Sequence, residues 1–385
     1  MFCRTGHAFS LAAALVGTVI GAGFLSGAEL VRFFPAQGVL PHAAVAAGLF
    51  FLCFLFLYRL GGACGGFAGV LARFGKAAPL LRAVLLASSF VLCAGMLAGM
   101  ESLAREGFGL DLPFPLLSLL ALLPLYFLSG RGMRGLYAVD VALVPLILLF
   151  IVTRAGGALQ SMQPEAPGGA AASLAGVCLY VSMNAFLAAP VVCDAGAADR
   201  AKGAARAGAA GCAMAALFLG FCIAAVAGAV AGSGAGSAEL PFLAALGGGR
   251  AMRLLFSAVC ACAILTSLFS AYYPLHRAAG GAPRPGLLRA GICAAAFLLS
   301  AAGLGGLVRF VYPLVGVAGV LFFLALALSA LRRSGSRPRA QSAPVFRPER
   351  PGQLLFDEDP FRQRDGGIHA CRQNAEDDGR RHHEI

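Results

Sequence analysis

The amino-acid sequence predicts an all-helical integral membrane protein with ten transmembrane helices. Of its 385 residues 59% are hydrophobic and only 12% are charged, and the mean hydropathy is +0.81. A soluble globular protein has roughly 25% charged residues, and a disordered chain has low hydrophobicity. Both classes are therefore excluded for most of the length. Long apolar stretches, and the placement of basic residues between them, give the helix count.

Ten apolar stretches have the character of membrane helices, each of which needs ~20 mostly apolar residues. Polar, glycine-rich or proline-rich breaks separate them. The expected spans are 9–34, 39–58, 84–104, 113–129, 135–153, 172–193, 208–231, 252–275, 287–303 and 308–331. Residues 332–385 are polar and have no helical period, so we expect a transmembrane domain over 1–331 and a disordered cytoplasmic tail over 332–385.

Basic residues are concentrated in every second connection between these stretches, as at Arg73 and Lys76 and again at Arg200 and Lys202. Cytoplasmic loops of membrane proteins carry an excess of arginine and lysine. The alternation therefore predicts an even number of spans in the plasma membrane, with both termini in the cytoplasm. It also explains the net charge of +12 by contact with anionic membrane lipid, and no nucleic-acid partner is expected.

The first span contains residues that a membrane helix normally avoids. Gly17, Gly21, Gly23 and Gly27 weaken the helix near mid-membrane, and Ser26-x-x-Glu29 has the spacing of a capping box, which starts a helix. We therefore expect two half-helices that meet around residues 21–25. The alternative is an intact helix whose GxxxG patterns let neighbouring helices approach closely.

The sixth span has polar residues at mid-depth, Ser182 and Asn184, followed by Pro190, which lacks a backbone donor. Taken alone, this pattern fits a proline kink with Asn184 bonded to a neighbour. However, the first and sixth spans each open a set of five, and interrupted helices in corresponding positions indicate an inverted-repeat transporter. The expected repeats cover about 9–155 and 172–331.

The eighth span carries two adjacent hydroxyl residues, Thr266 and Ser267, within an apolar helix. Such hydroxyls commonly bond back to carbonyls of their own helix. The functional alternative is a site for a hard cation, in which the two hydroxyls, the carbonyl of Ala263 and carbonyls freed by an unwound first span supply the oxygen ligands.

Three motifs resemble a known family. The run from Gly21 to Glu29 followed by Phe33-Phe34, the run from Leu179 to Asn184, and the run from Val311 to Gly316 resemble the YkvI-like bacterial membrane proteins. These look like distant members of the amino acid–polyamine–organocation superfamily. The resemblance covers roughly residues 9–331 and implies a LeuT-like five-plus-five inverted repeat with helices 1 and 6 discontinuous. The family pattern has Gln before the Glu, where this chain has Ala28, so no role is carried over for that side chain.

The resemblance also implies two sets of binding residues. The set for sodium lies on the first and eighth helices and comprises Gly17, Ile20, Ala263, Thr266 and Ser267. The set for substrate lies on the interrupted parts of the first and sixth helices and comprises Gly21, Ala22, Gly23, Ser182 and Asn184. A second sodium site, found in some members, needs an asparagine after the first-helix glycines. Phe24 stands there, so no second site is expected.

Three charged residues within the spans admit two interpretations. Glu29 and Arg32 are a capping carboxylate with a nearby ion pair, or else a gate or proton-coupling group. Asp140, six residues after Arg134, is expected near the end of the fifth span, where snorkelling or pairing is favoured over a proton relay.

The sequence thus predicts a secondary transporter, a cation-coupled symporter of a small organic solute that works by alternating access, with an amino acid as the first candidate. The alternative is a non-transporting membrane receptor or sensor of nutrients on the same scaffold. No catalytic constellation occurs in the spans, so an enzyme is not expected. No cofactor is expected beyond a sodium ion for coupling, and the sequence specifies no protein partner.

Overall fold

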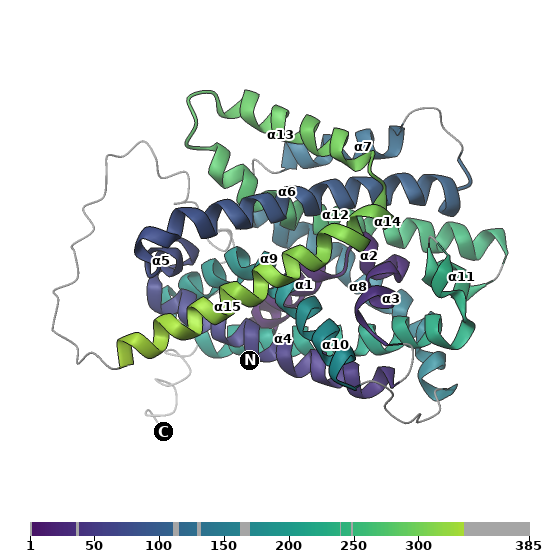
Figure 1. Ribbon diagram of the computed structural model, residues 1–385, viewed down its shortest axis with the longest axis horizontal. Helices are drawn as coiled ribbons and strands as arrows, with labels where there is room; N and C mark the ends of the chain where they lie inside the picture. Colours follow the sequence, from purple (N-terminus) through teal and green to yellow (C-terminus); the bar gives the residue numbers. More distant parts are fainter. Residues whose placement is uncertain are drawn as a thin grey trace, which may run out of the picture. The chain divides into compact units, whose positions relative to one another are not determined.

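The computed structural model describes residues 2–35, 38–110, 115–128, 132–161, 170–238, 240–247 and 249–334, and the regular structure within these ranges is helical. The longer helices are α1 (Phe2–Val19), α4 (Val39–Cys64), α6 (Ala78–Ser102), α7 (Leu116–Leu128), α8 (Gly132–Ser161), α9 (Ala170–Ala201), α10 (Ala205–Ser233), α12 (Arg250–Ala279), α13 (Pro285–Ser300) and α15 (Tyr312–Ser334). The shorter ones are α2 (Ala22–Ser26), α3 (Ala28–Phe33), α5 (Phe67–Ala72), α11 (Pro241–Leu246), α14 (Leu304–Gly306) and the single turns η1 (Gly75–Ala77), η2 (Leu103–Gly107), η4 (Ala235–Ser237) and η5 (Leu307–Val311). A helix thus lies over each apolar stretch that the sequence indicates (Figure 1).

The length and apolar character of these helices confirm a multi-pass membrane protein. Six described helical segments are long and apolar enough to cross a bilayer: Val39–Cys64, Gly75–Gly107, Leu174–Ala201, Ala205–Ser233, Arg250–Ala279 and Leu304–Ser329. Three described apolar helices are shorter: Gly6–Val19, Leu116–Tyr126 and Pro285–Ser300. The count of ten spans therefore stays a prediction.

Helix α1 lies at the centre of the bundle. It packs against α8, α9, α10 and α12, and every residue from 11 to 27 is buried. By contrast α7 and α13 lie side by side beyond α6 (Figure 1). A backbone that leaves the helix at membrane depth is tolerated only where protein or a water-filled cavity surrounds it. The central position of α1 therefore permits the break described below.

Small residues bring α4 and α9 into close contact. A Cβ atom on Gly61 of α4 would overlap the main chain of Cys193 on α9, and one on Gly196 of α9 would overlap the carbonyl of Tyr58 on α4. The two backbones therefore touch at these glycines, as in other membrane helix pairs built on small residues.

This contact predicts a difference between two equivalent substitutions on α4. We expect Gly61→Ala to lower the thermal unfolding temperature of the detergent-purified protein, because the added methyl forces the two helices apart at a cost of about 1–3 kcal/mol. Gly48→Ala is the matched control, since Gly48 has nothing within 4 Å of the added atom. Equal unfolding temperatures for the two variants would contradict the close contact.

The prediction of a discontinuous sixth helix is wrong. α9 runs without a break from Ala170 to Ala201 and includes Pro190. The polar groups in its middle are satisfied without unwinding, because the Ser182 hydroxyl and the Asn184 amide bond to main-chain carbonyls. The stretch also lacks the glycines that weaken the first span. Residues 332–334, predicted to begin the tail, end α15 instead; the rest of the predicted tail and the Arg134 side chain lie outside the described residues.

Candidate solute and cation site

The first span is interrupted near its glycines as predicted, but at two places, on either side of α2, and not at the single junction expected around residues 21–25. α1 ends at Val19, and the N–H of Gly21 bonds to the carbonyl of Val19 at 3.0 Å instead of continuing the helical pattern to Gly17. A second break at Gly27, whose φ of +87° lies in the left-handed region, separates α2 from α3. Glycine adopts this conformation without the steric penalty of a side chain. The break near Gly21 leaves the Gly17 carbonyl available to another partner.

The predicted capping box is wrong. The Ser26 hydroxyl donates to the carbonyl of Gly23 at 3.1 Å and accepts from the N–H of Ala28 at 3.3 Å, while Gly27 holds the N-cap position of α3. The carboxylate of Glu29 turns back instead and packs against Gly23. The ion pair with Arg32 is also absent from the structure, because Glu29 is buried and Arg32 is exposed.

Of the predicted sodium residues, Gly17 and Ser267 meet where α12 passes the first break. Ser267 of α12 donates its hydroxyl hydrogen bond to the carbonyl of Gly17 at 2.8 Å, and its oxygen would lie 2.9 Å from a Cβ atom on Gly21. The Thr266 hydroxyl bonds back to Ala263 at 2.9 Å within its own helix. Ile20, Ala263, Thr266 and Ser267 are all buried. Ser267 thus binds across to α1, whereas Thr266 follows the ordinary pattern of a membrane helix.

Asp140, in the first third of α8, lies inside the bundle beside this contact, so the expected snorkelling of its side chain is wrong. It is fully buried, and neither of its carboxylate oxygens has a hydrogen-bond partner among the described residues. Its Oδ1 lies 2.5 Å from the position that a Cβ atom on Gly17 would take. An ionisable residue inside a membrane helix marks a functional site by default. That rule was the available sequence signal for Asp140.

Three buried oxygens converge beyond the second break, from three different helices. The Glu29 Oε2 of α3, the Tyr180 hydroxyl of α9 and the Tyr312 hydroxyl of α15 have no hydrogen-bond partner within 3.5 Å among the described residues. Tyr180 is close enough to Glu29 and to Asn184 for long, weak side-chain hydrogen bonds, and Tyr312 lies within electrostatic reach of Glu29. The two tyrosines were not predicted, because a tyrosine in an apolar span reads equally well as core.

The predicted substrate residues of the first span, Gly21, Ala22 and Gly23, lie against Met96 or Glu29. The N–H of Ala22 bonds to the sulfur of Met96 at 3.4 Å, and Gly21 lies against the same methionine. Gly23 lies against Glu29. Glycine at both positions leaves the room that these two side chains fill.

The predicted substrate residues of α9 are already engaged. The Ser182 hydroxyl bonds to the carbonyl of Leu179 at 3.0 Å and to that of Gly316 on α15 at 2.9 Å. The Asn184 amide bonds to the carbonyl of Tyr180 at 2.9 Å. Ser182 therefore joins two helices, and Asn184 lies one turn from Tyr180 at the edge of the oxygen cluster.

Polar side chains join the helices at the end of the bundle that contains the start of α1. His7 of α1 and Tyr58 of α4 both contact the carboxylate of Asp199 on α9, each at 2.7 Å. Nearby, Asp194 of α9 pairs with Arg277 of α12. The contacts of Asp199 join α9 to α1 and α4, and the Asp194–Arg277 pair joins α9 to α12.

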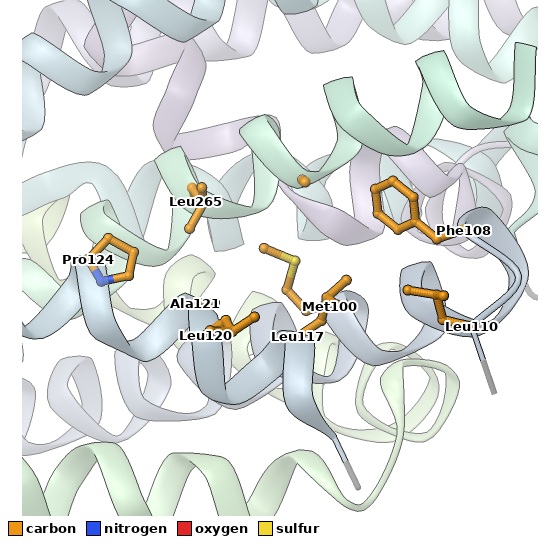
Figure 2. Close-up of a pocket in the computed structure, with 9 residues that line it drawn as sticks. Met100, Phe108, Leu110, Leu117, Leu120, Ala121, Pro124 and Leu265 are labelled. Atoms are coloured by element: carbon orange, nitrogen blue, oxygen red, sulfur yellow. The ribbon is translucent and has the colours of Figure 1, made fainter. Parts of the chain in front are cut away.

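A separate apolar pocket of about 380 Å³ lies between α6, α7 and α12. Figure 2 shows its lining, which comprises Met100, Phe108, Leu110, Leu117, Leu120, Ala121, Pro124, Ala261 and Leu265. It offers no charged or hydrogen-bonding side chain, so its chemistry does not suit a polar solute.

Comparison with solved structures shows which fold the chain has. The inward-facing conformation of the transporter Mhp1 superposes with a TM-score of 0.56 at 17% identity, covering 84% of this chain and 75% of that one. The closed conformation of Mhp1, a nucleobase-cation-symport-1 family transporter with bromovinylhydantoin bound, gives 0.51 at 15% identity, covering 84% and 74%. These likenesses show the LeuT fold, which confirms the predicted fold type. The structural neighbours are transporters and not enzymes.

The particular resemblance to YkvI is also confirmed. The chain is 28% identical over 151 residues to the uncharacterized membrane protein YkvI of Bacillus subtilis strain 168. The match covers 38% of this chain and 43% of that protein, so it spans less than half of the relative's length. No protein-family model matches the chain.

Proposed function

We propose that this protein is a secondary transporter that couples the movement of a small organic solute to a sodium ion. The contact between Ser267 and the Gly17 carbonyl supports this most directly, because it joins two helices at the break in the central one. A cation that binds only when both helices are in place stabilises one conformation over others. Its binding would thereby shift the opening of the site from one side of the membrane to the other.

The cation site would use main-chain and hydroxyl oxygens near the break. Its members are Gly17, Ile20, Ala263, Thr266 and Ser267. Asp140 adds a negative charge beside Gly17, and a buried charge is strongly unfavourable unless a charge of opposite sign is close. Since no described side chain pairs with this carboxylate, a bound sodium ion would supply the missing positive charge.

The same proposal includes the organisation of the chain in the membrane. Ten spans would form repeats over about 9–155 and 172–331, with both termini and the 332–385 tail in the cytoplasm. The helices found over all ten predicted stretches support this arrangement, as does the alternation of basic loops. An amino acid is the proposed solute class. Gly21, Ala22, Gly23, Ser182 and Asn184 would surround it, and Glu29 would face it.

Uptake into proteoliposomes tests the proposal. An inward sodium gradient should drive accumulation of at least one member of a panel of radiolabelled amino acids above its external concentration. For Ser267→Ala, with or without Thr266→Ala, we expect the sodium concentration for half-maximal uptake to rise about tenfold or more, because the change removes an oxygen ligand of the ion; tenfold corresponds to ~1.4 kcal/mol. Ser329→Ala is the matched control, because its hydroxyl bonds only within α15.

Two results would overturn the sodium claim. One is accumulation that is equal with and without a sodium gradient, and the other is unchanged sodium dependence when Thr266→Ala and Ser267→Ala are combined. Saturable binding of an amino acid without any accumulation would instead favour the alternative function, a nutrient receptor on a transporter scaffold.

A further inference from the structure

We propose that Glu29, Tyr180 and Tyr312 form a binding site for a primary ammonium group. The site would recognise the amino group of the solute, so it rests on the proposed entry of a solute into the bundle. Three elements contribute one residue each: α3 after the second break, α9 and α15.

No basic side chain among the described residues pairs with the carboxylate of Glu29, and its polar neighbour is the Tyr180 hydroxyl. Glu29 is only 3% exposed, and its Oε2 has no hydrogen-bond partner within 3.5 Å among the described residues. The basic side chain nearest in sequence, Arg32, is exposed. A negative charge without a counter-charge is strongly unfavourable inside a membrane protein. The carboxylate of Glu29 therefore suits a cationic group brought in from outside.

Packing holds the two phenol groups in place. The ring of Tyr180 contacts those of Phe33, Phe34 and Phe50, with centroid separations of 5.7, 5.3 and 6.2 Å. The hydroxyl of Tyr312 occupies the space where a Cβ atom on Gly95 would lie. Both hydroxyls are buried, and neither has a hydrogen-bond partner within 3.5 Å among the described residues. A rigid, preformed site binds its ligand with a smaller loss of conformational freedom.

The acceptors match a primary ammonium in number and charge. Such a group has three N–H donors and no acceptor. One carboxylate and two phenol oxygens can accept from it, and the carboxylate balances its charge. Hydrogen bonds between charged groups of this kind are roughly twice as strong as neutral ones. A proton held on Glu29 is the competing explanation, and it would leave both phenol oxygens without a role in selectivity.

Thermal stabilisation of the purified protein tests the site. The probes are the standard amino acids and, for each one that stabilises, the matching decarboxylated amine and the matching deaminated acid. Wild type should be stabilised by the amino acid and the amine but not by the deaminated acid. Glu29→Gln should weaken binding about tenfold or more, and Tyr180→Phe and Tyr312→Phe should each weaken it severalfold. Glu101→Gln, which makes the same change on α6 near the exposed Arg105, should bind like wild type.

Several outcomes would overturn this inference. They are stabilisation by the deaminated acid equal to that by the amino acid, unchanged amine binding in Glu29→Gln, and no stabilisation of wild type by any amine. Loss of pH dependence in Glu29→Gln with intact amine selectivity would show a proton site instead. Amine binding that depends on Glu29 without any uptake would leave the inference standing and refute transport. Uptake restricted to solutes without an amino group would refute the ammonium site and leave transport standing.

Discussion

Replacing Asp140 with asparagine is expected to abolish most of the sodium dependence of uptake. The change keeps the shape of the side chain but removes the charge that we place beside the cation. Removing one partner of a buried charge pair weakens the interaction by ~2 kcal/mol or more, so the sodium concentration for half-maximal uptake should rise about 30-fold or more. The measurement is the initial rate of uptake into proteoliposomes over a series of sodium concentrations.

Thermal unfolding separates this effect from misfolding. In wild type, sodium should raise the unfolding temperature, because a ligand that binds only the folded state stabilises it. In Asp140→Asn, sodium should have little effect. Without sodium the variant should be as stable as wild type or more so, since the change removes a buried charge that has no partner among the described residues. A variant with the sodium activation of wild type would show that Asp140 takes no part in cation binding.

Replacing Gly17 with alanine should nearly eliminate uptake and lower stability. The added methyl would lie 2.5 Å from Oδ1 of Asp140 and 3.2 Å from Cγ2 of Val144, so both side chains on α8 must move. Overpacking of this kind typically costs about 1–3 kcal/mol, and here it also displaces the carbonyl that accepts from Ser267. The measurements are uptake and thermal unfolding of the purified protein.

A second glycine of α1 provides the matched control for this prediction. Gly6 has nothing within 4 Å of an added Cβ atom, and alanine is the better helix former by ~1 kcal/mol. Gly6→Ala should therefore transport like wild type and unfold at the same or a higher temperature. Normal uptake by Gly17→Ala would show that the close approach of α8 to the break has no functional importance.

Local chemistry made the break in the first span predictable. The glycines of that span act through their own backbone freedom, so their effect can be read from a short stretch of sequence. The spacing of Ser26 and Glu29 was misleading because Gly27, between them, adopts a left-handed conformation and becomes the cap itself. In α9, Pro190 was outweighed by neighbouring residues that satisfy their polar groups within a continuous helix.

The composition of the site depends on contacts between distant segments. The eighth span showed two hydroxyls, but only the tertiary structure distinguishes Ser267, which bonds to α1, from Thr266, which bonds within α12. Asp140 and Tyr312 join the site because α8 and α15 pack against the first span and its neighbours. Within its own span Asp140 is marked only by being ionisable, and Tyr312 is not marked at all. Whether a residue belongs to the site therefore depends on where its helix lies in the bundle, which the sequence of that helix does not specify.

Direct binding of radioactive sodium to the purified protein tests the central claim most closely, because it needs no knowledge of the solute. We predict saturable binding by wild type that is lost or greatly weakened in both Ser267→Ala and Asp140→Asn and is retained in Ser329→Ala. Absence of saturable binding to wild type, or equal binding by all four proteins, would contradict a sodium site at the interruption of the central helix.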